Sequence, residues 1–114
     1  MVHEAVSTAE KLSEDGFEIE IVDLRCVKPI DIETVLGSIA RTGRVLAIGE
    51  AFPWGGVTAE IISQITSEGF NLLDAPPARL NSLDTPIPYH PELWRFHRPT
   101  AHSIEDKIRK LIKE

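Results

Sequence analysis

The chain has 114 residues, of which 42% are hydrophobic and 26% charged, and its single cysteine excludes an internal disulfide. This length and composition fit one folded domain with one core and exclude an intrinsically disordered chain. Residues 1–94 hold six Lys or Arg and fifteen Asp or Glu, a formal charge of −9, whereas residues 95–114 are basic. An acidic body repels phosphate backbones, so the charge argues against nucleic-acid binding and leaves a solvated surface or a basic protein partner as alternatives.

The first part of the chain predicts a helix followed by a strand. Apolar residues recur at helical spacing from Val2 to Leu12, and Gly16 follows as a helix stop. Residues 17–24 then alternate apolar with acidic side chains, which is typical of a strand near a sheet edge. We expect Cys26, just beyond, to be a free and buried thiol.

A second helix and a second strand are expected next. Asp31 can cap a helix with an apolar stripe, and Gly43 can close it in a left-handed conformation. Residues 45–48 form a continuous apolar run, which favours a central strand of a parallel sheet. The stripe consists of Ile32, Val35, Leu36 and Ile39.

The second half predicts a loop from Glu50 to Gly56, a third helix that ends near Gly69, and a last strand at about residues 78–81. Residues 82–102 are rich in proline and predict an extended loop. Ser103 and Asp106 occupy capping-box positions for a C-terminal helix over 103–114. Strands alternating with helices predict one α/β domain over 1–114, with three layers and a mostly parallel sheet.

No residue pattern predicts a catalytic, cofactor-binding or metal site in this chain. The four histidines, His3, His90, His97 and His102, include no pair at i, i+4, so we interpret them as exposed or locally hydrogen-bonded. Gly55-Gly56 could present N–H groups to an anion at a helix start, but a tight turn or a close chain approach is the favoured interpretation.

Large aromatic side chains fall in the predicted loops. Trp54 lies next to the glycine pair, and Trp94 and Phe96 lie in the proline-rich segment. They would either anchor an interface or cover their own core, and the sequence leaves both open. The candidate interface residues are Glu50, Trp54, Gly55, Gly56, Asp84, Trp94 and Phe96.

Several short motifs occur in a distinctive order along nearly the whole chain. They are Val22-Asp23-Leu24-Arg25, Lys28-Pro29-Ile30-Asp31, Gly49-Glu50-Ala51 with Gly55-Gly56 and Ala59-Glu60-Ile61, Leu73-Asp74-Ala75-Pro76, and Asp84-Thr85-Pro86-Ile87-Pro88. This set resembles the C-terminal, transketolase C-terminal-like domain of the beta subunit in thiamine-diphosphate-dependent 2-oxo-acid dehydrogenases, which act on pyruvate, branched-chain 2-oxo acids or acetoin.

The resemblance implies a non-catalytic role in assembly and partner docking. In that family, thiamine diphosphate and magnesium bind between the alpha subunit and the N-terminal domain of the beta subunit, so this chain alone is expected to bind neither and to be inactive. The implied partners are that alpha subunit or N-terminal beta domain and the acyltransferase component, in an oligomer. The alternatives are a transketolase-like carboligase domain that reaches a substrate site at a subunit boundary, and a free-standing small-ligand domain.

One feature of the family is missing. There, a strand and a short turn precede the helix that begins here at Val2, and that strand lies inside the sheet. We therefore expect a sheet without its first strand, from a fragment or a mis-set start. The strands near Ile19 and Ile48 would then either pair with each other or leave an exposed gap, which a strand borrowed from another molecule could fill. No apolar run spans a bilayer and no signal peptide is recognisable, so a cytoplasmic protein without membrane contact is expected.

Overall fold

A computed structural model describes all residues from Met1 to Glu114. At its centre is a two-stranded parallel sheet in which β1 (Leu46–Ile48) pairs with β2 (Ala78–Leu80). Helix α3 (Val57–Gly69) and a short 3-10 helix, η1 (Phe70–Leu72), connect the two strands. This βαβ unit confirms the α/β class and the parallel direction of the sheet.

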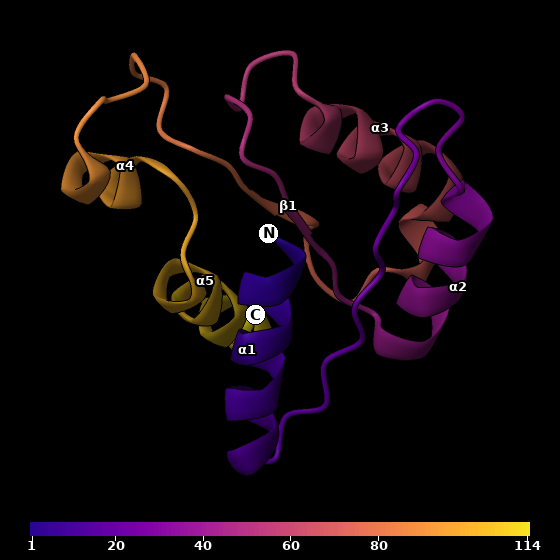
Figure 1. Cartoon of the computed structure of the whole chain (residues 1–114). Coiled ribbons are helices and arrows are strands. Elements are labelled where there is room, and N and C mark those ends of the chain that lie inside the picture. Colours follow the sequence, from indigo (N-terminus) through magenta and orange to yellow (C-terminus); the bar gives the residue numbers. More distant parts are fainter.

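Helices cover both faces of the sheet (Figure 1). Helices α1 (Val2–Glu14) and α5 (Ala101–Lys113) pack against each other on one face, and α2 (Ile32–Thr42) packs beside α3 on the other. Helix α4 (Pro91–His97) lies apart from both layers, at the end of a long connection from β2. The layers thus place the open loops and α4 together at one end of the molecule.

Local signals account for the two ends of α2. The Asp31 carboxylate accepts a hydrogen bond of 3.1 Å from the backbone N–H of Thr34, which satisfies a free donor of the first turn. At the other end Gly43 adopts φ 71°, and its N–H donates to the carbonyl of Ile39 over 2.7 Å. The predicted cap and the predicted stop are both confirmed.

The core has two parts. One is an apolar cluster between α2, β1 and α3 that consists of Val35, Ile39, Ala47, Ile61 and Ile65. The other consists of Leu12, Ile104 and Leu111, which are buried where α1 meets α5. The two parts belong to the helical layers on opposite faces of the sheet (Figure 1).

The strand predicted over residues 17–24 is wrong. Residues 18–25 form neither helix nor strand, although they run as an open chain beside the sheet (Figure 1). Their apolar and acidic alternation suits a strand, but a strand also needs a hydrogen-bonding neighbour, and β1 pairs only with β2. The sheet therefore has two strands.

The structure also changes the predicted boundaries near the C-terminus. The segment over 82–102 is not wholly irregular, because α4 begins at Pro91, where a proline costs nothing at the first helical position. Helix α5 begins at Ala101 rather than Ser103, and its capping box consists of Thr100 and Ser103 rather than Ser103 and Asp106.

Cys26 is exposed, contrary to the burial expected of it. It lies in a turn that follows the unpaired segment, and its thiol donates to the carbonyl of Lys28 over 3.4 Å. Arg25, immediately before it, has φ 57°, so the chain turns outward there instead of continuing as a buried strand.

Candidate docking surface

The loops after β1 and β2 lie together at one edge of the sheet. Residues 49–56 follow β1 and residues 81–90 follow β2, and both loops emerge at the top of Figure 1. Because the strands are parallel, their carboxyl ends meet at the same edge, which is where α/β folds most often present binding residues. Five of the seven candidate residues lie in these two loops, and the other two, Trp94 and Phe96, lie on α4, which follows the second loop.

Side chains from β2 and from the residue that follows it hold the first loop in place. The Asn81 amide donates to the carbonyl of Ala51 over 3.1 Å and accepts from the Thr58 hydroxyl over 2.8 Å. The Arg79 guanidinium donates to the carbonyl of Pro53 over 2.6 Å. Sequence reasoning missed these positioning residues, because nothing in their local pattern shows that a strand would lie beside this loop.

Gly55 and Gly56 form the tight turn that ends this loop. Gly55 adopts φ 64°, which suits glycine, and a Cβ on Gly56 would lie 2.7 Å from the carbonyl oxygen of Phe52. Gly56 is also the N-cap residue of α3, with an extended backbone. The close approach that Gly56 permits is therefore made by its own chain.

His97 joins the two loops to α4. It is only 6% exposed, and its Nδ1 lies 3.2 Å from the hydroxyl of Thr85. Its ring meets that of Phe52 edge-on, with centroids 6.1 Å apart. Its carbonyl accepts from the N–H of Leu83 over 2.9 Å. The sequence alone predicts an exposed or locally hydrogen-bonded histidine, whereas His97 is buried and contacts both loops.

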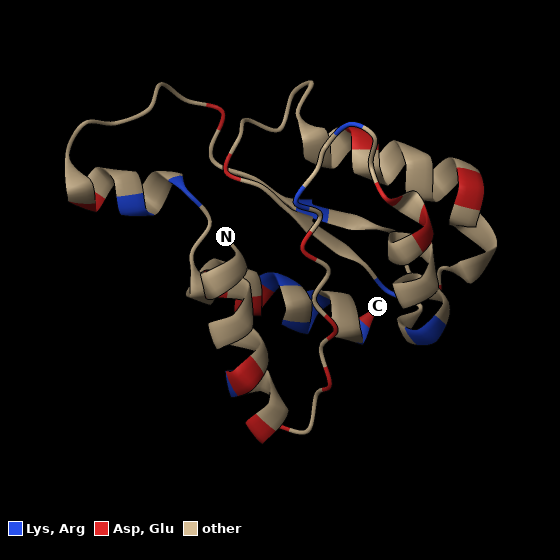
Figure 2. Ribbon diagram, turned by 45° about the vertical axis from the view of Figure 1, so that its right-hand side comes forward, with Lys and Arg blue, Asp and Glu red and all other residues tan.

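Exposed apolar side chains gather on these three segments. We call this set the apolar loop surface: Phe52, Trp54, Leu83, Ile87, Tyr89, Leu93, Trp94 and Phe96. Residues 51–59 and 85–91 carry no Lys, Arg, Asp or Glu, so these stretches of the two loops are tan in Figure 2. Monomeric proteins seldom leave a large contiguous apolar patch in water, so a set of this size suggests contact with another molecule.

The candidate residues differ in how much of each side chain is exposed to solvent. Trp54 is 84% exposed and Phe96 is 81% exposed, so neither covers the core of this chain. Trp94 is partly covered, because the Arg98 guanidinium lies 4.7 Å from the centre of its ring. Glu50 and Asp84 are exposed at the start of the two loops.

The chain has neither a cluster of metal ligands nor a helix suited to cross a membrane. No three or more His, Cys, Asp and Glu side chains come together where they could hold a metal ion. No helix combines the length and apolar character that a membrane crossing requires.

Known proteins resemble this chain closely. The family model for the transketolase C-terminal domain matches residues 1–104. The pyruvate dehydrogenase E1 component subunit beta-1 of Arabidopsis thaliana is 40% identical over 109 residues, which are 96% of this chain and 29% of that protein. The corresponding subunit beta of Bacillus subtilis is 38% identical, over 99% of this chain and 34% of that protein.

A third relative has a different named activity. The beta subunit of acetoin:2,6-dichlorophenolindophenol oxidoreductase of Cupriavidus necator is 37% identical over 99% of this chain and 33% of that protein. The chain thus spans about a third of the length of these relatives. On the family match and these identities, the chain belongs to the transketolase C-terminal domain family, in the branch found in beta subunits of 2-oxo-acid and acetoin dehydrogenases.

Proposed function

We propose that this chain is an assembly and docking domain of the decarboxylating component of a 2-oxo-acid dehydrogenase complex. In this proposal thiamine diphosphate and magnesium bind to other domains of a cytoplasmic enzyme. This domain binds other subunits and contributes no catalytic residue. The names of the relatives, which are beta subunits of larger enzymes, support the proposal.

The apolar loop surface is the observation that carries the proposal. Aromatic side chains that protrude from a rigid support are the residues that most often dominate binding energy at protein interfaces. Here Trp54 and Phe96 protrude, while His97 and Asn81 hold the loops beneath them. A surface prepared in this way loses little conformational entropy when it binds.

The proposed partner of this surface is the alpha subunit or the N-terminal beta domain of the same enzyme, which would make the assembly an oligomer. The acyltransferase component is the second proposed partner, with α5 contributing to its contact. The acidic charge of residues 1–94 favours partners whose facing surfaces are basic.

Binding can be measured by surface plasmon resonance with the immobilised alpha subunit of a pyruvate dehydrogenase decarboxylating component. We expect Phe96→Ser to weaken binding tenfold or more, which corresponds to the loss of about 1.4 kcal/mol. Phe70→Ser is the matched control, because Phe70 is 69% exposed on η1, outside the apolar loop surface. Equal losses in the two variants, or no binding to the alpha subunit or the acyltransferase component, would contradict the proposal.

A separate measurement tests whether this domain binds the cofactor by itself. Titration of the chain with thiamine diphosphate and magnesium in a calorimeter is expected to give only the heat of dilution. Saturable heat that shows binding by the chain alone would contradict the assignment of the cofactor to other domains.

A further inference from the structure

Helix α4 divides its large side chains between two faces. Residues three positions apart lie on the same side of a helix, which pairs Trp94 with His97. The same spacing pairs Leu93 with Phe96. Trp94 is 41% exposed and His97 is buried, whereas Leu93 is 57% exposed and Phe96 is 81% exposed. The first pair is therefore turned towards the rest of the chain, and the second pair is turned towards solvent.

A helix as short as α4 does not hold itself in place. Isolated helices of fewer than about 12–15 residues are marginal in water. Helix α4 lies apart from both helical layers, so its position depends on contacts near its carboxyl end (Figure 1). His97 supplies one of these contacts, to the two loops. Arg98 supplies the other, to the layer of α1 and α5.

Arg98 follows α4 directly and contacts both α4 and α1. Its guanidinium carbon lies 4.7 Å from the centre of the Trp94 ring. Its Nη1 donates to one oxygen of the Glu4 carboxylate over 3.3 Å. The other oxygen of that carboxylate accepts from the N–H of Ala101 over 2.9 Å. One carboxylate therefore joins α1 and α5 to the residue that holds α4.

The guanidinium of Arg98 keeps this position although one of its donors is unpaired. Its Nε is buried and has no hydrogen-bond partner, which is unfavourable. A side chain free to turn would move this donor into water. The contacts with the Trp94 ring and the Glu4 carboxylate must therefore outweigh the penalty, since a cation over a ring face and a charged hydrogen bond are both favourable.

We infer that Arg98 is the positioning residue of α4. By joining Trp94 to Glu4, it sets the direction in which the helix leaves the body of the domain. Leu93 and Phe96 then protrude together as a pair of anchors. The partner surface that fits such a pair is an apolar groove that takes one turn of a helix.

The inference rests on the proposed docking role only for the use made of α4. The position of α4 can be measured in the chain alone, so the inference and the docking role can fail separately. The loop over 49–56 is held by Arg79 and Asn81 instead. Docking by Trp54 is therefore expected not to depend on Arg98.

The fluorescence of Trp94 reports the position of α4 without any partner. In Trp54→Phe it is the only tryptophan, and Arg98→Gln in this background removes the charge and the reach to Glu4. We expect the acrylamide quenching constant to rise about twofold, because the ring loses its cover. Arg95→Gln is the matched control, since Arg95 is exposed on the same helix and forms no ion pair.

The control is expected to leave the quenching constant unchanged. A constant in Arg98→Gln equal to that of the unaltered helix would overturn the inference. A rise of the same size in Arg95→Gln would do so as well, because the effect would then come from the net charge of α4.

A double-mutant cycle with the immobilised alpha subunit tests whether α4 is positioned for docking. Phe96→Ser is expected to weaken binding tenfold or more in the unaltered chain but less than about threefold in Arg98→Gln, because α4 no longer presents the side chain. Trp54→Ser is expected to weaken binding equally in both backgrounds. If Phe96→Ser has the same effect in both, the inference is wrong. Absence of all binding would contradict the docking role, and the quenching of Trp94 would then decide the position of α4 alone.

Arg98→Lys separates a positioning charge from a side chain that only fills space. Lysine keeps a positive charge that can pair with Glu4 and lie near the ring of Trp94, so we expect binding within about threefold of the unaltered chain. Arg98→Gln is expected to bind about tenfold more weakly than the unaltered chain. Equal binding by the lysine and glutamine variants would show that the charge has no part in positioning and would overturn the inference.

Discussion

Gly43 shows how one residue can serve both local and tertiary structure. Its left-handed backbone closes α2, and its carbonyl accepts from the N–H of Asp74 over 2.7 Å. A Cβ at this position would lie 2.6 Å from Cγ of Asp74. Gly16 also has a positive φ, of 86°, but a Cβ there would meet nothing within 4 Å. The two glycines therefore separate the cost of backbone strain from the cost of crowding.

We expect Gly43→Ala to destabilise the domain more than Gly16→Ala does. The backbone conformation alone should lower the free energy of unfolding by about 1–2 kcal/mol in each variant. Crowding against Asp74 should add about 1–3 kcal/mol to the loss in Gly43→Ala. Urea unfolding followed by circular dichroism measures both values, and equal losses would show that the Asp74 side chain moves aside freely.

At the scale of elements, polar contacts join α1 to α5. The Glu4 carboxylate accepts from the N–H of Ala101 over 2.9 Å, at the first turn of α5. Glu105, which is 9% exposed, accepts from Lys11 over 2.7 Å and from Arg109 over 2.9 Å. These hydrogen bonds, with that from Lys11 the largest contribution, hold the pKa of Glu105 below its usual value of 4.5.

The lowered pKa predicts a pH-dependent contribution to stability. A carboxyl group whose pKa falls on folding stabilises the folded state above its unfolded pKa, and this stabilisation disappears as the pH falls through the folded value. We expect Glu105→Gln to be less stable than the unaltered chain at pH 7, with the difference shrinking steadily below pH 4.5. Urea unfolding at several pH values measures it.

Glu10→Gln is the control for that series. Glu10 is exposed on α1 and takes part in no hydrogen bond or ion pair of the chain. Its substitution is expected to change stability by less than about 0.5 kcal/mol. A difference between Glu105→Gln and the unaltered chain that stays constant from pH 7 to pH 3 would mean that packing, not charge, determines the effect.

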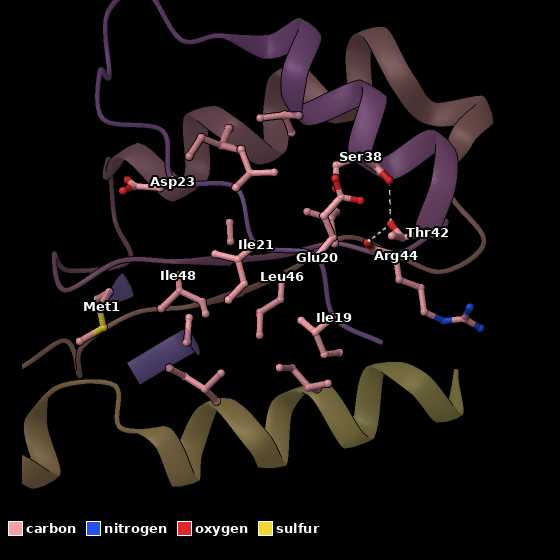
Figure 3. A pocket seen from close by; sticks show the side chains of 18 of the residues that line it. Met1, Ile19, Glu20, Ile21, Asp23, Ser38, Thr42, Arg44, Leu46 and Ile48 are labelled. Atoms are coloured by element: carbon pink, nitrogen blue, oxygen red, sulfur yellow. Dashed lines mark hydrogen bonds between the residues drawn. The ribbon is translucent and has the colours of Figure 1, made fainter. Parts of the chain in front are cut away.

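At the scale of the whole molecule, a cavity of about 710 Å³ lies between the α2–α3 layer and the α1–α5 layer and is lined by residues of both (Figure 3). The α2–α3 layer has its own apolar cluster with β1, and the α1–α5 layer has a second one. The chain that passes between them over residues 18–23 has no backbone hydrogen bonds. Stability within a protein is uneven, and segments of this kind open at the lowest free energy.

We therefore expect the rates of amide hydrogen exchange to differ strongly between two parts of the isolated chain. The amides of residues 19–23 should exchange at rates close to those of an unstructured peptide, whereas amides in α2 and α3 should be protected strongly. Nuclear magnetic resonance of the labelled chain measures this directly. Strong protection of residues 19–23 in a monomer would show that they pair in solution.

The family, the α/β class and most helices could be predicted from the sequence, because their signals lie within a few residues of each other. Asp31 and Thr34 form a cap three residues apart, Gly43 follows the helix that it closes, and the apolar run at 45–48 indicates a buried strand wherever it pairs. The candidate loop residues could be chosen for the same reason, since turns and exposed aromatic residues are local features.

Only the tertiary structure decided which segments meet. The strand expected at residues 17–24 does not form in it, because a strand needs a hydrogen-bonding neighbour and local alternation does not specify one. The tertiary structure also exposed Cys26, brought His97 against Phe52 and Thr85, and placed Asn81 beneath the loop after β1. Each of these contacts joins residues far apart in sequence, and their energies depend on distances that no local pattern encodes.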